Sequence, residues 1–597
     1  MQVENAIEIA WNPTSDQSLK AQAFDFLNRL RSDPSGREAC LTLFTKSPKA
    51  SEVVRLVSLD VINNAIQTQQ LDGQSLSHLK ESFLEYIRRT YGSGGQEQID
   101  PPSLQNKLTQ SLTVLFISLY KQGWENFLDD FLSLTSTQNN GSRDNLLGIV
   151  LYLRILGSIH DEIADVMVAR TSAETKRNTD LKDTLRARDV QKVTASWQEI
   201  LIQWRDRNDA VVEMTLKVIG KWVSWVDISL IVNQEMLNLL FPLVGRTGTE
   251  DKVRDAAIDT FTEIVAKKMK AADKIAMIVF LNLGEVISQL IASPALNDQR
   301  STSTYDNDLA EAVAKLVNNV VFDIVKVLDD TQAATEVRLQ AENLLQTFLP
   351  LLLRFFSDEY DEICSTVIPS LTDLLTFLRK AQPLPLTYSA MLSPILNAII
   401  QKMRYDETSS WGNEDEQTDE AEFQELRKRL QVLQKSVAAV DETLYVEILS
   451  NVVGNTFQQL DQQGGQMDWR DLDLALHEMY LFGELTVPNG GLYAKSQPSS
   501  VAAERLIAMM SKMVESGKLG STRFRSSCTN GSKALHHLPI LLFNYNIWRS
   551  VFDIARSSRT RPTSFHKSWS SSSVSFTIIT LESESAPGIS STDSSNI

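Results

Sequence analysis

The sequence predicts an all-α fold in which helices stack one after another into a solenoid. Three observations favour this fold. The chain has 597 residues, more than the roughly 250 to 300 that one hydrophobic core usually supports, so it must form several domains or a repeat array. Apolar residues make up 43% of it, while 24 Gly and 17 Pro leave few residues for the dense turns of an all-β protein. Finally, apolar side chains recur at helical spacing in segment after segment.

The helical period can be followed along the chain. Pro101 and Pro102 precede Ser103, whose hydroxyl we expect to cap a helix that continues to Leu119. Helix follows helix with no credible strand between them. Besides 103–119, we expect helices at 76–87, 124–131, 146–156, 197–204, 211–226, 256–270, 276–291, 309–328, 335–356, 363–378, 392–403, 422–440, 444–460, 469–485 and 501–514.

These helices have the spacing of a repeat. About twenty helices joined by short turns give a period of about 40 residues, which is that of HEAT or armadillo units in an α-solenoid superhelix. Separate helical bundles would need Pro/Gly-rich linkers between them. The candidate linkers are short, and we interpret them as inter-helix loops: 92–102, 136–144, 293–308, 405–422 and 486–500. We therefore divide the array into N-terminal repeats at 1–135 and further repeats at 136–517.

The last 80 residues, 518–597, break the pattern. Residues 521–597 contain 20 serines, with eight basic and four acidic side chains, and show no sustained helical period. The one strand-like run of the chain, SVSFTIIT at 573–580, has no partner strand. One interpretation is a disordered regulatory tail. The other is the product of a retained intron or a shifted reading frame, which an array without a polar capping repeat favours.

Several function classes are disfavoured by composition. The three cysteines are far apart, no HExxH occurs, and no P-loop, GxGxxG, GxSxG or kinase signature is present, so we expect no catalysis, cofactor or metal site. Glu4 and Glu8 lie where a signal peptide would be basic, and no apolar run reaches the ~20 residues of a membrane span, so we expect a soluble chain. A net charge of −17 disfavours a generic nucleic-acid binder but permits a local basic face.

Three basic clusters are candidate contacts with RNA or with a protein partner. Each also has a structural interpretation: a charged connecting helix for the first, complementation of a helix dipole for the second, and local pairing with Glu422 and Glu425 for the third. The first lies in 170–189, the second in 266–274, and the third follows an acidic block that begins at residue 412. Their members are Arg170, Lys176, Arg177, Lys182, Arg186 and Arg188; Lys267, Lys268, Lys270 and Lys274; and Arg427, Lys428 and Arg429.

Trp222 and Trp225, in KWVSWVDISL, lie three residues apart and would share one face of a helix. Such a pair can form a cage for a cation or a stacking platform for bases, or it can pack between helices. Because the pair continues the apolar stripe of Leu216 and Ile219, we favour packing. We expect Asp227 to be the N-cap of the following helix.

Several stretches resemble the exportin-T family, the tRNA exportins of the importin-β/karyopherin superfamily, in its fungal form. They are KWVSWVDISLIVN, RTSAETKRNTDLKD, QKMRYDE with EDEQTDEAEFQELRKRLQVL, and MDWRDLDLALHEMYLFGE. The opening helices, which include VVRLVSLDVINNAI, are similar to N-terminal karyopherin repeats. The resemblance covers residues 1 to about 517. No family contact can be assigned to an individual residue.

The resemblance implies a monomeric nuclear export receptor. Its N-terminal arch, residues 1–135, would bind Ran-GTP while the superhelix encloses mature tRNA cooperatively, passes the nuclear pore by contact with nucleoporins, and releases the tRNA in the cytoplasm when GTP is hydrolysed. Family members are longer, so we expect this chain to bind Ran weakly and to close poorly around tRNA. The alternative is a HEAT-repeat scaffold or an import karyopherin without an RNA role.

Overall fold

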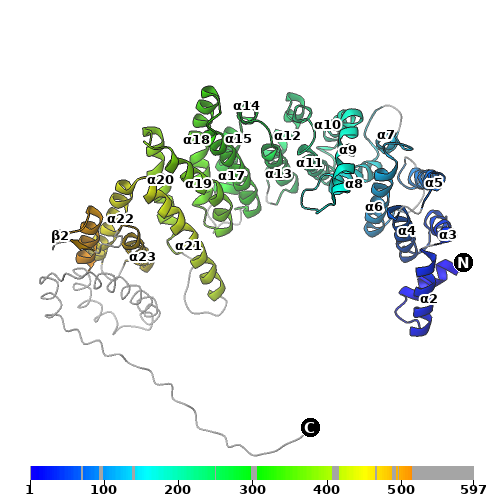
Figure 1. Cartoon of the computed structure of the whole chain (residues 1–597), viewed down its shortest axis with the longest axis horizontal. Coiled ribbons are helices and arrows are strands. Elements are labelled where there is room, and N and C mark those ends of the chain that lie inside the picture. The colour runs from blue at the N-terminus through cyan, green and yellow to red at the C-terminus, as the bar shows by residue number, and fades with distance from the viewer. Residues whose placement is uncertain are drawn as a thin grey trace, which may run out of the picture. The chain divides into compact units, whose positions relative to one another are not determined.

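The structure is a computed structural model. It describes residues 2–31, 33–68, 71–92, 99–137, 141–248, 250–297, 305–406, 416–463, 467–486, 492–494 and 497–513 (Figure 1). The chain divides into two compact units, Met1–Pro383 and Leu384–Ile597. Almost every described element is a helix, which confirms the all-α prediction. The predicted tail at 518–597, with both of its interpretations, lies outside the described residues.

The N-terminal unit, Met1–Pro383, consists of helices that follow one another in chain order (Figure 1). Most are 10 to 23 residues long, as a HEAT-type array requires. They are α1 (Gln2–Trp11), α2 (Gln17–Leu30), α3 (Pro34–Thr45), α4 (Glu52–Gln67), α5 (Gly73–Tyr91), α6 (Pro102–Leu119), α7 (Phe127–Ser133), α8 (Leu146–Ile163), α9 (Ser172–Arg188), α10 (Val190–Trp204), α11 (Asp209–Val223), the 3-10 turn η1 (Ile228–Leu230), α12 (Gln234–Val244), α13 (Lys252–Ala266), α14 (Ala271–Leu281), α15 (Leu283–Ala292), α16 (Pro294–Asn297), α17 (Asn307–Asp329), α18 (Thr335–Phe356) and α19 (Asp361–Lys380).

One row of helices forms the spine of this unit. In the order α4, α6, α8, α11, α13, α17 and α19, each helix packs against the next, while the remaining helices pack beside the row. The stripes of apolar residues that predicted the helices are the faces buried between them, as on α17 from Leu309 to Leu328. Helix pairs that bury their faces only against neighbouring pairs make an α-solenoid. The predicted fold class is therefore confirmed.

The C-terminal unit contains four long helices, α20 (Leu386–Lys402), α21 (Glu416–Val440), α22 (Glu442–Gln463) and α23 (Trp469–Thr486), and a further helix over 501–513. Two short antiparallel strands, β1 (Tyr493–Ala494) and β2 (Gln497–Pro498), lie between α23 and this last helix, with Tyr493 opposite Pro498. The expectation that no strand interrupts the helices is wrong at this point, because two-residue strands leave no alternating pattern that a sequence could show.

Several predicted helix boundaries are corrected by the structure; the helix expected at 211–226, for example, ends at Val223. The helix predicted from Ser103 begins at Pro102, with Pro101 at the N-cap, because proline suits the first helical turn; the Ser103 hydroxyl instead donates to the Glu52 carboxylate. The segment 256–270 leaves the helix after Ala266. The segment 276–291 is divided by Asn282, whose left-handed backbone (φ +47°) ends α14 and starts α15.

A helix must be both long and apolar to span a membrane. Among the described residues, no single helix is long and apolar enough to span a bilayer, although the bent pair α14 and α15 together meets those two criteria.

Candidate functional site

The first basic cluster forms α9. Thr171 and Glu174 make a reciprocal capping box at its start, which fixes where the helix begins. Only Asn178, Leu181 and Leu185 of α9 are buried, so the helix presents nearly all of its polar side chains to solvent. Such a helix fits the predicted charged connection between repeats and leaves cations available for contact.

Two arginines at the ends of this cluster brace the fold. The Arg170 guanidinium donates to the backbone carbonyls of Asp161 (2.8 Å) and Glu162 (3.0 Å) at the C-terminal end of α8. Arg188 donates to the Tyr120 carbonyl (2.9 Å) and lies 4.0 Å above the Tyr120 ring. Because both guanidinium groups are already occupied by the fold, the structural interpretation accounts for them.

The first and second clusters meet in space. Arg186 donates from Nε to the Trp225 carbonyl (2.9 Å), and the Lys267 ammonium donates to the carbonyls of Val223 (2.8 Å) and Val226 (2.8 Å). These carbonyls lie at the C-terminal end of α11, which carries partial negative charge. Two segments far apart in sequence therefore bring their cations to one helix end. We name this group of Lys182, Arg186, Lys267, Lys268 and Lys270 the basic rim.

The cations of the basic rim repel one another. The pKa of Lys182 is lowered, first by partial burial and then by the charges of Arg186 and Arg170. The pKa of Lys267 is lowered first by partial burial and then by nearby cations, of which Arg186 has the largest effect. Lys268 and Lys270 are exposed on the loop that joins α13 to α14. The rim thus gathers positive charge that the fold neutralises only in part, since Asp183 pairs with Arg186 at 2.6 Å.

Other members of the two clusters lie outside the rim. Lys274 is buried, donates to the Lys267 carbonyl (2.7 Å) and forms an ion pair with Asp323 (2.8 Å). Arg177 forms an ion pair with Glu162 at 3.4 Å, and Lys176 is exposed on α9. Lys274 therefore belongs to the core of the fold, whereas Lys176 lies on the open surface.

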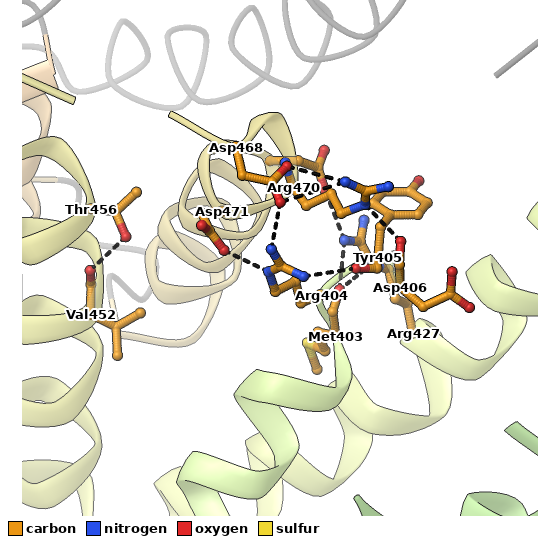
Figure 2. Close-up of polar contacts among 11 residues, drawn as sticks. Met403, Arg404, Tyr405, Asp406, Arg427, Val452, Thr456, Asp468, Arg470 and Asp471 are labelled. Carbon is orange, nitrogen blue, oxygen red and sulfur yellow. Dashed lines mark hydrogen bonds and ion pairs between the residues drawn. The ribbon is translucent and has the colours of Figure 1, made fainter. Parts of the chain in front are cut away.

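The third cluster, in the C-terminal unit, has one interior arginine and two exposed cations. Arg427 is buried and donates to the Met403 carbonyl (2.9 Å) (Figure 2). It also forms an ion pair with Asp473 (2.7 Å). Its guanidinium lies 4.4 Å from the centre of the Tyr405 ring. Lys428 pairs with Glu425 one helical turn away, as the local-pairing interpretation predicts, and Arg429 is exposed. Arg427 is a packing residue and is not accessible to a ligand.

A polar network beside Arg427 was missed at the sequence level. Arg404 bridges Asp468 (2.7 Å) and Asp471 (2.5 Å), and Arg470 donates to the Asp406 carbonyl (2.6 Å), so the start of α23 is fastened to the segment after α20 (Figure 2). The charged run WRDLDL was the available signal, but its partners lie more than 60 residues away in the chain. The network holds helices together.

The tryptophan pair packs between helices. Trp222 is fully buried, with its indole N–H donating to the Leu156 carbonyl (2.9 Å), and Trp225 donates to Nδ1 of His160 (3.2 Å). Burial lowers the pKa of His160 to about 4, so the ring stays neutral and can accept this bond. The packing interpretation is confirmed and the cage is excluded. The expected cap is only partly right, because Asp227 caps the turn η1 while Asn233 caps α12.

Two family models, both of exportins, match separate parts of the chain. The exportin-T family model matches residues 335–526, and the model described as exportin 1-like protein matches residues 101–261. Curated exportin-T proteins of Sclerotinia sclerotiorum and Botryotinia fuckeliana are each 74% identical over 518 residues, which are 86% of this chain and 50% of the relative. The exportin-T of Chaetomium globosum is 66% identical over 519 residues.

A solved structure shares the fold. The structure described as importin 13 in its cytosolic state aligns with a TM-score of 0.52 and 11% identity, covering 75% of this chain and 51% of that one. At this identity the likeness shows the α-solenoid fold alone. The sequence matches are far closer: over 86% of its length the chain is 74% identical to curated exportin-T proteins, and it spans about half the length of the curated relatives it matches.

Proposed function

We propose that the chain is a nuclear export receptor for tRNA that binds its cargo together with Ran-GTP. The observation that carries this proposal is the 74% identity to curated exportin-T proteins over 86% of the chain. Identity at this level over 518 residues supports a set of partners shared with these relatives. Exchange between nucleus and cytoplasm through nucleoporin contacts, as a single chain, is part of the same proposal.

The solenoid suits this function physically. Helix pairs stacked in a row offer an extended surface, which a folded RNA can contact at many phosphates and sugars without any reading of sequence. An acidic chain with a net charge of −17 limits non-specific capture of RNA, so binding depends on local basic groups and on shape. Release follows from linkage, because loss of Ran-GTP removes whatever free energy its binding had contributed to holding the tRNA.

The test is a reciprocal binding measurement. Fluorescently labelled mature tRNA is titrated with the purified chain, alone and with Ran locked in its GTP or its GDP form. Because the chain spans about half the length of its curated relatives, we expect it to bind each partner weakly on its own. We still expect Ran-GTP to lower the Kd for tRNA by at least about 5-fold, and tRNA to lower the Kd for Ran-GTP by the same factor, as a coupling free energy of about 1 kcal/mol or more requires. A Kd for tRNA that is the same with both forms of Ran would overturn the proposal.

The same titration separates the alternatives. A protein scaffold would bind neither form of Ran selectively. An import karyopherin without an RNA role would bind Ran-GTP, but its affinity would not change when tRNA is added. An RNA hairpin of equal length serves as the control for shape, because a receptor for tRNA should bind the hairpin more weakly in the presence of Ran-GTP.

A further inference from the structure

We propose that the basic rim, formed by Lys182, Arg186, Lys267, Lys268 and Lys270 around the C-terminal end of α11, is a binding site for RNA phosphates. The identity of the RNA rests on the proposed function. The presence of an anion site follows separately, from how the fold places these side chains.

The first argument is convergence. Arg186 belongs to α9 and Lys267 follows α13, yet both donate to carbonyls within residues 223–226. These bonds fix the positions of two cations at a helix C-terminus that carries only about half an elementary charge. Asp183 pairs with Arg186 and Asp227 acts on Lys267, so the five cations of the rim face two carboxylates and keep an excess of positive charge. Arg186 also lies 5.7 Å from the centre of the Trp225 ring, and the indole N–H of Trp225 donates to His160. The rim is therefore built on a rigid base.

The second argument is electrostatic. Like charges held close together oppose folding. Partial burial is the largest cause of the lowered pKa values of Lys182 and Lys267, and the positive charge of Arg186 lowers both further. No hydrogen-bond or ion-pair partner of Lys182 occurs among the described residues, and its neighbour Asp183 pairs with Arg186 instead. An anion at the rim would relieve this repulsion. Destabilising arrangements of this kind are typical of binding sites.

The third argument concerns the class of partner. Within α9 and the loop 267–270, which the structure describes in full, no large apolar side chain is strongly exposed. Protein interfaces usually have an apolar centre, whereas interfaces with nucleic acids are more polar and more positively charged. The rim therefore fits phosphates better than an acidic protein. An apolar surface does exist nearby, at Val166 and Met167 before Arg170, and it makes a protein partner the outcome to exclude.

The experiment measures how RNA binding depends on salt. Lys182→Glu and the double variant Lys268→Glu/Lys270→Glu are compared with the original chain, and with Lys252→Glu as a matched control, because Lys252 is exposed at the N-terminal end of α13, opposite the end that Lys267 follows. Binding of tRNA with Ran-GTP is measured from 50 to 300 mM salt. We expect each lost phosphate contact to reduce the slope of log Kd against log salt by about 0.7 to 0.9, while the control keeps the full slope.

Two further measurements make the result decisive. An RNA hairpin of equal length is titrated in parallel; if it binds as well as tRNA, the proposed function fails, but a reduced slope in the rim variants would still support the phosphate site. Affinity for Ran-GTP alone is measured as well. Unchanged slopes with both RNAs overturn the inference, and so does a loss of Ran-GTP affinity at unchanged slope, which would assign the rim to a protein partner. Circular dichroism and Tm confirm that each variant is folded.

Discussion

A single buried carboxyl makes the C-terminal unit sensitive to pH. Glu478 on α23 is fully buried and accepts from the Gln434 amide (2.5 Å), while its other oxygen has no partner within the described structure. Burial raises its pKa to about 7. The other groups that face it are the Tyr445 hydroxyl from α22, Arg427 from α21, and His477 beside it in sequence. The folded unit therefore holds a proton on Glu478 at pH values where the unfolded chain has lost it.

Glu478→Gln is expected to stabilise the unit increasingly as pH rises from 5 to 8. Between the ordinary pKa of 4.5 and the folded value of about 7, only the folded state keeps the proton, so the original chain loses stability across this window, by about 3 kcal/mol in total. Urea unfolding at several pH values measures the difference between the two proteins. The neutral glutamine removes this loss.

The measured quantity must be the difference in stability between Glu478→Gln and the original chain, because two histidines change stability with pH in the opposite direction. Burial lowers the pKa of His160 to about 4 and that of His477 to about 3, so both contribute stability that is gained as pH rises towards 6.5. Both are present in each protein and cancel. Glu447→Gln, at an exposed position of α22, is the matched control. A stability difference between Glu478→Gln and the original chain that is constant from pH 5 to 8 would contradict the prediction.

Arg427 is expected to be among the costliest side chains to remove from the C-terminal unit. Arg427→Met leaves the buried Asp473 carboxylate and the Met403 carbonyl without their donor, which typically costs about 3 to 5 kcal/mol of stability. Adding Asp473→Asn removes the stranded charge and should restore part of this loss. A double-mutant cycle by urea unfolding measures the coupling. Strict additivity of the two changes would show that the ion pair contributes nothing.

The same residue shows what a sequence does and does not reveal at this scale. In the run Arg427 to Arg429 three cations look alike, but Arg427 lies three and seven residues before Leu430 and Gln434, which are both buried. That spacing was a usable signal for an interior position. The partner Asp473 lies 46 residues away, and nothing local indicates it. Burial could thus be predicted from the sequence, but the ion pair could not.

At the scale of elements, long apolar stripes predicted helices well. The segment 335–356 was expected and is α18, Thr335–Phe356; the segment 309–328 was expected and lies within α17, Asn307–Asp329. Errors occur where backbone conformation decides the boundary, as at Asn282, which lies inside a continuous apolar stripe. The basic rim was missed for another reason. Its two halves were both recognised as candidates, but their meeting at α11 depends on how repeats stack.

The break at Asn282 gives a prediction at this scale. Asn282→Ala keeps the β-carbon in a left-handed backbone conformation (φ +47°) but removes the side-chain amide that makes this conformation tolerable, which should cost about 1 kcal/mol. Asn282→Gly, which adopts this conformation freely, should cost less than the alanine variant. Thermal unfolding of both variants tests the order. An alanine variant more stable than the glycine variant would mean that a continuous helix over α14 and α15 is accessible at low cost.

At the scale of the whole molecule, periodicity was sufficient to predict the solenoid, because every repeat must bury one face against its neighbours. The division between Pro383 and Leu384 was not foreseen, since the short run QPLPL there resembles other inter-helix turns. The boundary placed between residues 135 and 136 remains a prediction. The proposed function was suggested by stretches that resemble the exportin-T family, and neither periodicity nor charge pattern could have predicted it.

The row of helices from α4 to α19 also bears on how the chain folds while it is being synthesised. Partners across the row are close in sequence: the Thr113 hydroxyl bonds to Ser158 across 45 residues, and the Thr260 hydroxyl bonds to the Leu216 carbonyl across 44. A ribosome adding roughly 5 to 20 residues per second needs only a few seconds to deliver each next partner. Every completed repeat then offers a finished face to the one that follows. Assembly can proceed from the N-terminus during synthesis, and little apolar surface then stays exposed until distant residues are made.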